Sequence, residues 1–301
     1  MKYNWSIIGH EKQLLQIEKD IESGNLAHAY LLAGANSVGK YTVAKKMAGI
    51  LQCENDFCHQ CNTCLQVEKG CHIDTVEFVD EGESIKIDEV RKIVERLNMT
   101  RQSRYKILLI QGLERMSIEA SNSFLKTLEE PPSRTVFIMT TNNIRLILPT
   151  ILSRVRIVKF NCVSLSFLKE KLMELYPDCD EETINTVSLL SLGKTGKAVH
   201  LMENPESLAN YLKIYHDVQN FLQHRNIADR FSYVENLTTS DEPQVEPFLN
   251  ILTHVLRSKV LEKDPGAPLY IKTLSKIDEA GMLLKKNVNA RLVLENLMLQ
   301  I

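Results

Sequence analysis

The chain has 301 residues, a length typical of two or three domains and ample for a buried core. Its 36 basic and 38 acidic residues leave a net charge of −2. This balance excludes a global electrostatic field that would draw the chain onto nucleic acid or an acidic membrane. Any contact with DNA must therefore be local or shared with partners.

Neither a targeting segment nor a membrane segment is visible in the sequence. The amino-terminal stretch MKYNWSIIGHEKQ lacks the continuous apolar run of a signal peptide, and no segment offers the ~18 apolar residues of a membrane span. We therefore expect a cytoplasmic protein without membrane contact. Seven cysteines, four of them between Cys53 and Cys64, favour metal ligation in a reducing compartment over a disulfide framework.

The first predicted strand, AYLLAG, leads directly into the loop GANSVGKYT at residues 34–42. This loop matches the pattern G-x-x-x-x-G-K-[ST] at Gly34, Gly39 and Lys40, and an amphipathic helix follows it. A strand, a glycine-containing loop and a helix in this order bring backbone N–H groups and a helix N-terminus to one anion. The sequence therefore predicts a phosphate-loop fold.

The groups that would bind magnesium are missing from this loop and from a later strand. Tyr41 stands where a metal-binding hydroxyl belongs, and the helix rotates Thr42 by about 100° from that position. The third predicted strand, ILLIQG, ends in Gln111 and Gly112 instead of an acidic pair, and Glu114 comes two residues too late for the same strand register. ATP hydrolysis needs the hydroxyl and the acids to hold magnesium. We therefore expect the degenerate loop to keep the fold without hydrolysing ATP and without using Mg²⁺.

Four cysteines in LQCENDFCHQCNTCLQ have the spacing C-x4-C-x2-C-x2-C, which lets four thiolates close on one ion. The predicted ligands of a structural zinc ion are Cys53, Cys58, Cys61 and Cys64. An iron–sulfur cluster and free thiols remain as alternatives. Cys71 and His72 are near enough to replace a ligand, but we expect them to belong to the approach to the next strand.

The first half of the chain alternates between strand-like and helix-like segments. Helices between apolar strands predict a parallel sheet that is covered on both faces. The predicted strands are residues 29–34, 74–80, 105–112, 135–141 and 155–160.

Beyond residue 160 only helical patterns follow. A small three-helix unit is predicted at residues 165–176, 181–192 and 195–203, and long amphipathic runs continue from Pro205 to the end. The predicted domains are 1–162, containing the cysteine module at 53–64, then 163–204 and 205–301.

Several long segments resemble one known family. They are similar to the AAA+ clamp-loader family, and within it to the delta prime subunits of bacterial DNA polymerase III, over most of the chain and most strongly over residues 7–160. The segments that carry the resemblance are the cysteine module, IIGHEKQL (7–14), GNLAHAYLLAG (24–34), SIEASNSFLKTLEEPPSRTVFIMTTNNIRLILPTILSR (117–154) and NVNARLVLENL (287–297).

This resemblance implies an architecture and a set of partners. The expected fold is an α/β AAA+ phosphate-loop-type domain with an inserted zinc module, followed by a small helical lid domain and an all-helical collar domain. The expected function is that of a non-hydrolysing stator of the clamp loader, a part of the DNA polymerase III holoenzyme. The implied partners are ATP-binding tau or gamma subunits and delta in a hetero-pentamer, with the sliding clamp and primer-template DNA contacted through the complex.

The resemblance also assigns roles to particular residues. Ser153-Arg154-Val155 stands where the family has Ser-Arg-Cys, and the resemblance makes Arg154 an arginine finger that acts in trans at a neighbouring subunit's ATP site. From the residues alone, a surface salt bridge at Arg154 is the simpler interpretation, and Arg156 is a competing finger. Lys197, at the family's second sensor position, is expected in a solvated helix start. Glu129 and Glu130 are expected at a solvated helix end.

Two other functions remain open at this point. The chain could be an active ATPase motor subunit that uses Thr42 and Glu114 in unusual geometry. It could also be a zinc-dependent DNA-binding protein with a vestigial nucleotide fold, although its acidic balance counts against that function.

Overall fold

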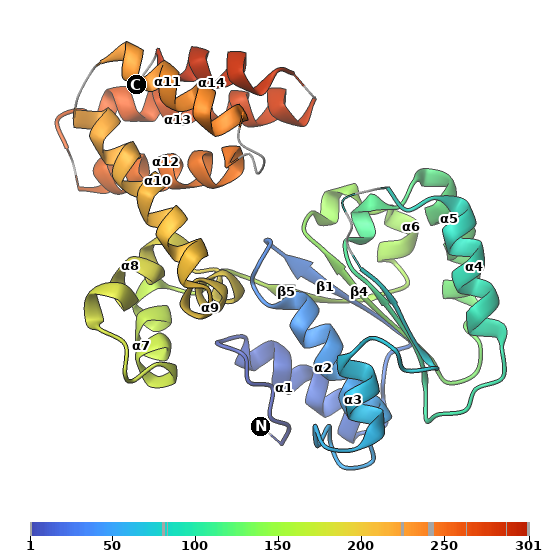
Figure 1. Cartoon of the computed structure of the whole chain (residues 1–301). Coiled ribbons are helices and arrows are strands. Elements are labelled where there is room, and N and C mark those ends of the chain that lie inside the picture. Colours follow the sequence, from blue (N-terminus) through green and yellow to red (C-terminus); the bar gives the residue numbers. More distant parts are fainter. Residues whose placement is uncertain are drawn as a thin grey trace. The chain divides into compact units, whose positions relative to one another are not determined.

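The computed structural model describes residues 2–79, 82, 84–223, 226–239, 244–262, 264–286 and 288–299. The chain divides into two compact units, Met1–Ala198 and Val199–Ile301. The first unit holds the sheet and the candidate sites, and the second is helical (Figure 1).

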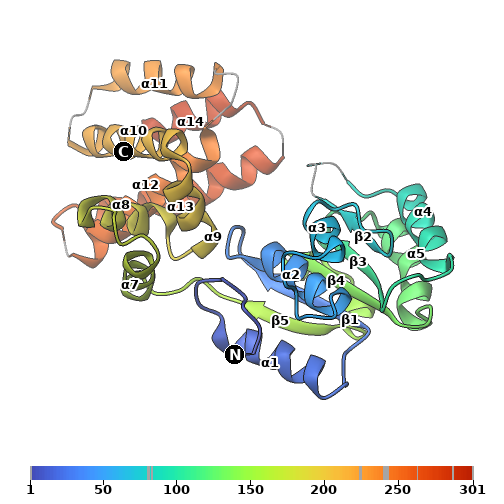
Figure 2. The same ribbon diagram turned by 60° about the horizontal axis from the view of Figure 1, so that its bottom comes forward.

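The sheet of the first unit has five parallel strands among the described residues, in the order β2-β3-β4-β1-β5 (Figure 2). Each predicted strand is present, with ends that differ by at most a few residues. The strands are β1 Ala29–Gly34, β2 Thr75–Phe78, β3 Lys106–Ile110, β4 Thr135–Thr141 and β5 Arg156–Phe160.

Helices cover both faces of this sheet, as the apolar strands require. Successive strand residues face opposite layers: Tyr30 and Leu32 join the core with α1, α2 and α3, whereas Ala29 and Leu31 join the core with α4, α5 and α6. The helices are α1 Glu11–Glu22, α2 Lys40–Gln52, α3 Asn62–Glu68, α4 Ile87–Asn98, α5 Ile118–Glu129 and α6 Pro149–Leu152, with 3₁₀ turns η1 Leu113–Arg115 and η2 Ile144–Leu146.

Helix ends in this unit are satisfied by nearby polar groups. The Ser117 hydroxyl accepts the Ala120 N–H at the start of α5. At the end of α4, the buried ammonium of Lys106 donates to the carbonyls of Arg96, Leu97 and Met99, at a helix terminus where carbonyls lack their usual intrahelical donors. A positive charge at a helix C-terminus also interacts favourably with the helix dipole.

Three helices follow the sheet where they were predicted: α7 Leu165–Leu175, α8 Glu181–Ser191 and α9 Thr195–Glu203. The expectation of a solvated start for the third helix is wrong. Thr195 is buried, its hydroxyl donates to the Val38 carbonyl at 3.3 Å, and the Lys197 N–H donates to the Ser37 carbonyl at 3.2 Å. Gly196 permits this approach, because a Cβ atom there would lie 2.9 Å from the Ser37 oxygen. The start of α9 is therefore fixed to the phosphate-type loop.

The second unit consists of packed helices. The neighbouring pairs are α10 with α12, α12 with α13, α13 with α14, and α11 with α14. Arg230, which is buried, donates to the carbonyls of Phe221 and Met298 and so satisfies the ends of two helices. The helices are α10 Pro205–Gln223, α11 Ile227–Thr239, α12 Val245–Leu261, α13 Ala267–Lys285 and α14 Ala290–Met298.

The α/β fold class is confirmed: a covered parallel sheet comes first and helices follow it. The domain boundaries at residues 162 and 204 stay predictions. Within the described ranges, every helix is too short or too polar to cross a membrane.

Candidate functional site

The loop after β1 forms the first candidate site. Its Lys40 is buried, and the ammonium donates to the carbonyls of Gly34 at 2.8 Å and Ala35 at 2.5 Å and to Oδ1 of Asn142 at 2.9 Å. Burial lowers the pKa of Lys40 to about 8, and the negative charge of Glu114 opposes this shift. The lysine is therefore engaged with its own chain, at the place where a phosphate group would sit.

Tyr41 does not direct its hydroxyl to an ion at the loop. It donates to Oε2 of Glu77 on β2 at 3.0 Å, and the ammonium of Lys45 lies 3.4 Å from the same oxygen. The Glu77 side chain is only 8% exposed, so this is a buried carboxylate held by a phenol and one cation. Burial and Glu77 together raise the pKa of Tyr41 above its ordinary value. Sequence reasoning missed this pair because no local pattern links residues 36 positions apart.

A small cavity of about 270 Å³ opens beside the loop. Gln111, the residue that follows β3, lines this cavity, and neither it nor the next residue, Gly112, carries a carboxylate. Thr42, which helix geometry was expected to turn away, is exposed and lines this cavity. The residues lining it are Asn36, Ser37, Gly39, Lys40, Tyr41, Thr42, Gln111, Thr140, Asn142 and Gly196.

Glu114 lies closer to the loop than its position in the sequence suggested. It falls in the turn η1, and its Oε1 accepts the N–H of Asn142 at 2.9 Å. Because Asn142 also accepts from Lys40, one hydrogen-bonded residue links the Glu114 carboxylate to the loop lysine. A carboxylate is thus present near the loop, but its Oε1 is occupied by a backbone amide.

Arg154 lies at the opposite end of the sheet from this loop. In β5, Arg156 is paired with Tyr30, and Phe160 is paired with Gly34, where the loop begins. Strands rise about 3.3 Å per residue, so these two ends are roughly 13 Å apart. Arg154 precedes this strand and is therefore farther still from the loop of its own chain.

In the single chain, Arg154 forms a surface salt bridge, which is the simpler interpretation of its sequence position. Its Nη2 lies 2.6 Å from Oε1 of Glu129, and its Nη1 donates to the Thr150 carbonyl at 2.9 Å and the Ser153 hydroxyl at 3.0 Å. The expected solvated pair at the end of α5 is confirmed, because Glu129 and Glu130 are both exposed, although Glu129 also pairs with Arg154. A cavity of about 550 Å³ adjoins the pair, lined by Ala27, His28, Ala29, Leu128, Glu129, Ser153, Arg154, Val155 and Arg156.

Arg156, the competing finger, has a structural partner. Its Nη1 lies 2.8 Å from Oδ1 of Asp20, whose other oxygen accepts the hydroxyl of buried Tyr30 at 3.0 Å. The Asp20 side chain is 9% exposed, so removing Arg156 would leave a buried carboxylate without its cation. This network makes Arg156 a part of the fold of the first unit.

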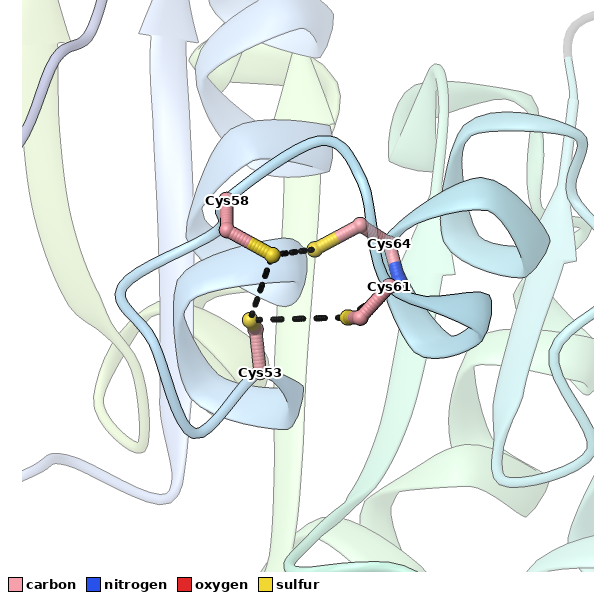
Figure 3. Close-up of side chains that lie close together, drawn as sticks. All are labelled: Cys53, Cys58, Cys61 and Cys64. Atoms are coloured by element: carbon pink, nitrogen blue, oxygen red, sulfur yellow. Dashed lines mark hydrogen bonds between the residues drawn. The ribbon is translucent and has the colours of Figure 1, made fainter.

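The four predicted cysteines converge at the end of α2 and the start of α3 (Figure 3). Their sulfur atoms all lie within 4.8 Å of one another, with Sγ separations of 3.9 Å for Cys53–Cys58, 3.8 Å for Cys53–Cys61 and 3.9 Å for Cys58–Cys64. Four thiolates at the Zn–S distance of about 2.3 Å would be about 3.8 Å apart in a tetrahedron. The cluster could therefore hold a single tetrahedral metal ion.

The pKa values of two cysteines shift in opposite directions: burial raises the pKa of Cys64, whereas backbone hydrogen bonds act on Cys58. The backbone N–H groups of Gln60 and Cys61 lower the pKa of Cys58 to about 6, which favours the thiolate that a metal binds. The ring of Phe57 packs on α2 at Gly49, where a Cβ atom would lie 2.3 Å from the ring. Cys71 is exposed, and His72 bonds to Thr75, so neither joins the cluster, as expected.

Comparison with known families shows which family the chain belongs to. The family described as DNA polymerase III, delta subunit, matches residues 9–164, which is more than half of the sequence. The chain belongs to this family. The matched region contains the whole sheet, the degenerate loop, the cysteine cluster and Arg154.

Individual relatives include more than one type of polymerase III subunit. The gamma subunit of Buchnera aphidicola subsp. Acyrthosiphon pisum is 33% identical over 69% of this chain and 60% of its own length. The delta′ subunit of Bacillus subtilis is 27% identical over 78% of this chain and 69% of its own length. A solved gamma subunit-related protein of Thermotoga maritima is 20% identical with a TM-score of 0.48, covering 94% of this chain and 97% of that one. The chain thus spans about three fifths of the length of two of the Buchnera gamma subunits that it matches and 41% of a third.

Proposed function

We propose that this chain is a clamp-loader subunit of DNA polymerase III that does not hydrolyse ATP itself and lends Arg154 to a neighbouring subunit's ATP site. One observation carries the first part: the Tyr41 hydroxyl, at the position of the metal-binding residue, is hydrogen-bonded to Glu77, while β3 is followed by Gln111 and Gly112. The delta′-like resemblance and family membership support the assignment to the clamp loader.

Magnesium chemistry explains why these changes matter. Mg²⁺ demands near-ideal octahedral oxygen coordination at about 2.0–2.1 Å and is bound beside a triphosphate by protein oxygens placed for it. In phosphate-loop enzymes those oxygens come from the residue after the loop lysine and from an acid at a strand end. In this chain the first is a phenol turned toward a buried carboxylate, and the second is an amide or a glycine.

The position of Arg154 favours action on another chain. It lies at the far end of the sheet from its own loop and beside a cavity of about 550 Å³. A guanidinium offsets charge on a transferring phosphoryl group and can bond to it through two N–H groups at once. Arg156 is paired with the buried Asp20, whereas Arg154 is paired with the exposed Glu129, and this difference favours Arg154 as the residue that acts on a neighbour.

The remaining parts of the proposal concern cofactor and partners. A structural Zn²⁺ would be held by Cys53, Cys58, Cys61 and Cys64, with no open coordination position for catalysis. The partners would be ATP-binding gamma or tau subunits and delta in a hetero-pentamer, and the complex would bring the chain to the sliding clamp and primer-template DNA.

A gamma-type ATPase is the second candidate, and two observations favour it. The Buchnera gamma subunits are more similar in sequence, at 33% and 34% identity, than the B. subtilis delta′ subunit at 27%. Thr42 lines the loop cavity, and Glu114 is linked to Lys40 through Asn142. Magnesium-dependent ATP hydrolysis by the purified chain would establish this function.

The test of the trans-acting role uses the assembled complex. Rings are reconstituted from purified subunits with wild-type chain, Arg154→Ala, or the matched surface variant Arg145→Ala. Arginine fingers contribute about 10³-fold or more to turnover, so Arg154→Ala should lose the share of steady-state ATP turnover that comes from the site it serves. The Arg145 variant should retain full turnover, and an Arg154→Ala ring with wild-type turnover would refute the assignment.

A further inference from the structure

Glu129 occupies a position where an acidic residue is unfavourable. It is the last residue of α5, where the exposed carbonyls give the helix end a partial negative charge. Glu130 and two prolines follow and prevent the helix from continuing. A nearby cation offsets the repulsion, and the cation present is Arg154, with Nη2 at 2.6 Å from Oε1 of Glu129.

The same guanidinium is held by two further acceptors. Its Nη1 donates to the Thr150 carbonyl and the Ser153 hydroxyl, both in the turn immediately before Arg154. The side chain is thereby folded back over its own turn, with the carboxylate on its other nitrogen. Because one carboxylate and two neutral oxygens bind one guanidinium, its orientation is defined before any partner arrives.

The pair is nevertheless easy to exchange. The side chains of Arg154 and Glu129 are 37% and 47% exposed, and exposed ion pairs contribute little net stability because water and salt screen them. A nucleotide phosphate offers more negative charge and a bidentate fit to the guanidinium. The Arg156–Asp20 pair differs, because the Asp20 side chain is 9% exposed and cannot regain water if the arginine leaves.

We propose that Glu129 is the exchangeable counter-ion of Arg154: it positions the guanidinium in the free chain and yields it to a phosphate of the neighbouring subunit's nucleotide in the ring. This inference rests on the proposed trans-acting role of Arg154. Glu129 itself touches no nucleotide, so it acts as a positioning residue. Its carboxylate competes with the phosphate for the guanidinium. It therefore weakens the binding of Arg154 to the phosphate without taking part in phosphoryl transfer.

The first experiment measures the pairing in the free chain. Phenylglyoxal modifies accessible arginines, and peptide mass spectrometry reports the modification rate of Arg154. Glu129→Gln should raise that rate about two- to fivefold, the range expected for release of an exposed ion pair. The neighbouring control Glu130→Gln should leave it unchanged, and 0.5 M salt should erase the difference because it screens the pair. An Arg154 rate that Glu129→Gln does not alter would overturn the proposal, provided that thermal melts show the variant folded.

The second experiment measures the exchange in the reconstituted ring. Glu129→Gln should lower the ATP concentration for half-maximal turnover about two- to fivefold and leave kcat unchanged, and it should have no effect in an Arg154→Ala background. A lowered kcat, or an equal effect without Arg154, would show a merely structural role and refute the proposal. If Arg154→Ala itself leaves turnover intact, the proposed function fails. The phenylglyoxal modification rates still show whether Glu129 pairs with Arg154 in the free chain. If Arg154→Ala lowers turnover but Glu129→Gln does not shift half-saturation, only the counter-ion role fails.

Discussion

Replacing Tyr41 with threonine completes the phosphate-loop motif, yet we expect the variant to gain no ATP hydrolysis and to lose stability. Threonine would supply a hydroxyl at the position of the metal ligand. The second requirement, an acid at the end of β3, would still be missing at Gln111 and Gly112. The lost phenol, by contrast, has a defined role in the fold, because it donates to Glu77 at 3.0 Å.

The size of the stability loss follows from the burial of that carboxylate. The Glu77 side chain is 8% exposed, and its Oε1 has no hydrogen-bond partner among the described residues. Without the Tyr41 hydroxyl, Lys45 at 3.4 Å is the cation that remains. An unpaired buried acceptor costs about 1–3 kcal/mol, and loss of the half-buried ring adds a cavity of smaller cost. We expect Tyr41→Thr to lower the free energy of unfolding by about 2–4 kcal/mol in total.

Urea unfolding followed by circular dichroism measures this loss, and phosphate release with Mg-ATP measures hydrolysis. Tyr41→Phe is the matched control, because it keeps the ring, removes only the hydroxyl and should cost about 1–3 kcal/mol. Adding Glu77→Gln to Tyr41→Phe should recover part of that loss, since a neutral amide is less costly to bury than a carboxylate. A Tyr41→Thr variant as stable as the wild type, or one that acquires magnesium-dependent turnover, would refute this reasoning.

Two further predictions concern the metal and the loop lysine. The purified chain should contain one zinc ion by elemental analysis. Cys64→Ser should lose this ion together with about 3 kcal/mol or more of stability in denaturant unfolding, whereas the control Cys71→Ser should keep both. A metal-free Cys71→Ser chain would contradict the four-cysteine site. Burial lowers the pKa of Lys40 from 10.5 to about 8, so between these pH values unfolding takes up a proton. The contribution of this group to stability therefore rises by up to about 3 kcal/mol as pH increases from 8 to 10.5, and it is constant below pH 8, where both states carry the proton. Urea unfolding of wild type and Lys40→Met between pH 7 and pH 10.5 should show this gain in their difference, and a constant difference would show that the ammonium is not destabilised by burial.

Local sequence patterns were sufficient to predict the strands and the cysteine cluster. The apolar run AYLLAG became β1 because both faces of a covered parallel sheet are buried, so Tyr30 and Leu31 serve opposite cores. The short spacing of Cys53, Cys58, Cys61 and Cys64 means that tight turns connect them, so their thiolates could be expected to converge. In both cases the determining contacts lie within a few residues or follow one periodicity.

Contacts between distant residues were the ones that sequence reasoning missed. The Tyr41–Glu77 bond and the contact of Thr195 with Val38 each join different elements. Their partners are ordinary polar residues whose sequence neighbours give no sign of the pairing. Glu129 illustrates the limit: it is exposed, as its place at a helix end predicted, but its pairing with Arg154 could not be read from either segment. The fold class could be predicted from sequence patterns, but the hydrogen bonds that the loop residues form with distant elements could be found only in the tertiary structure.

The central claim is that this chain lacks the oxygen ligands needed to seat magnesium beside a triphosphate. Titration calorimetry of the purified chain with ATP, with and without Mg²⁺, combined with an assay of phosphate release, tests it most directly. We predict no magnesium-dependent binding heat and no phosphate release above that of Lys40→Ala. Magnesium-dependent ATP hydrolysis that Lys40→Ala abolishes would contradict the claim and establish the gamma-type ATPase function.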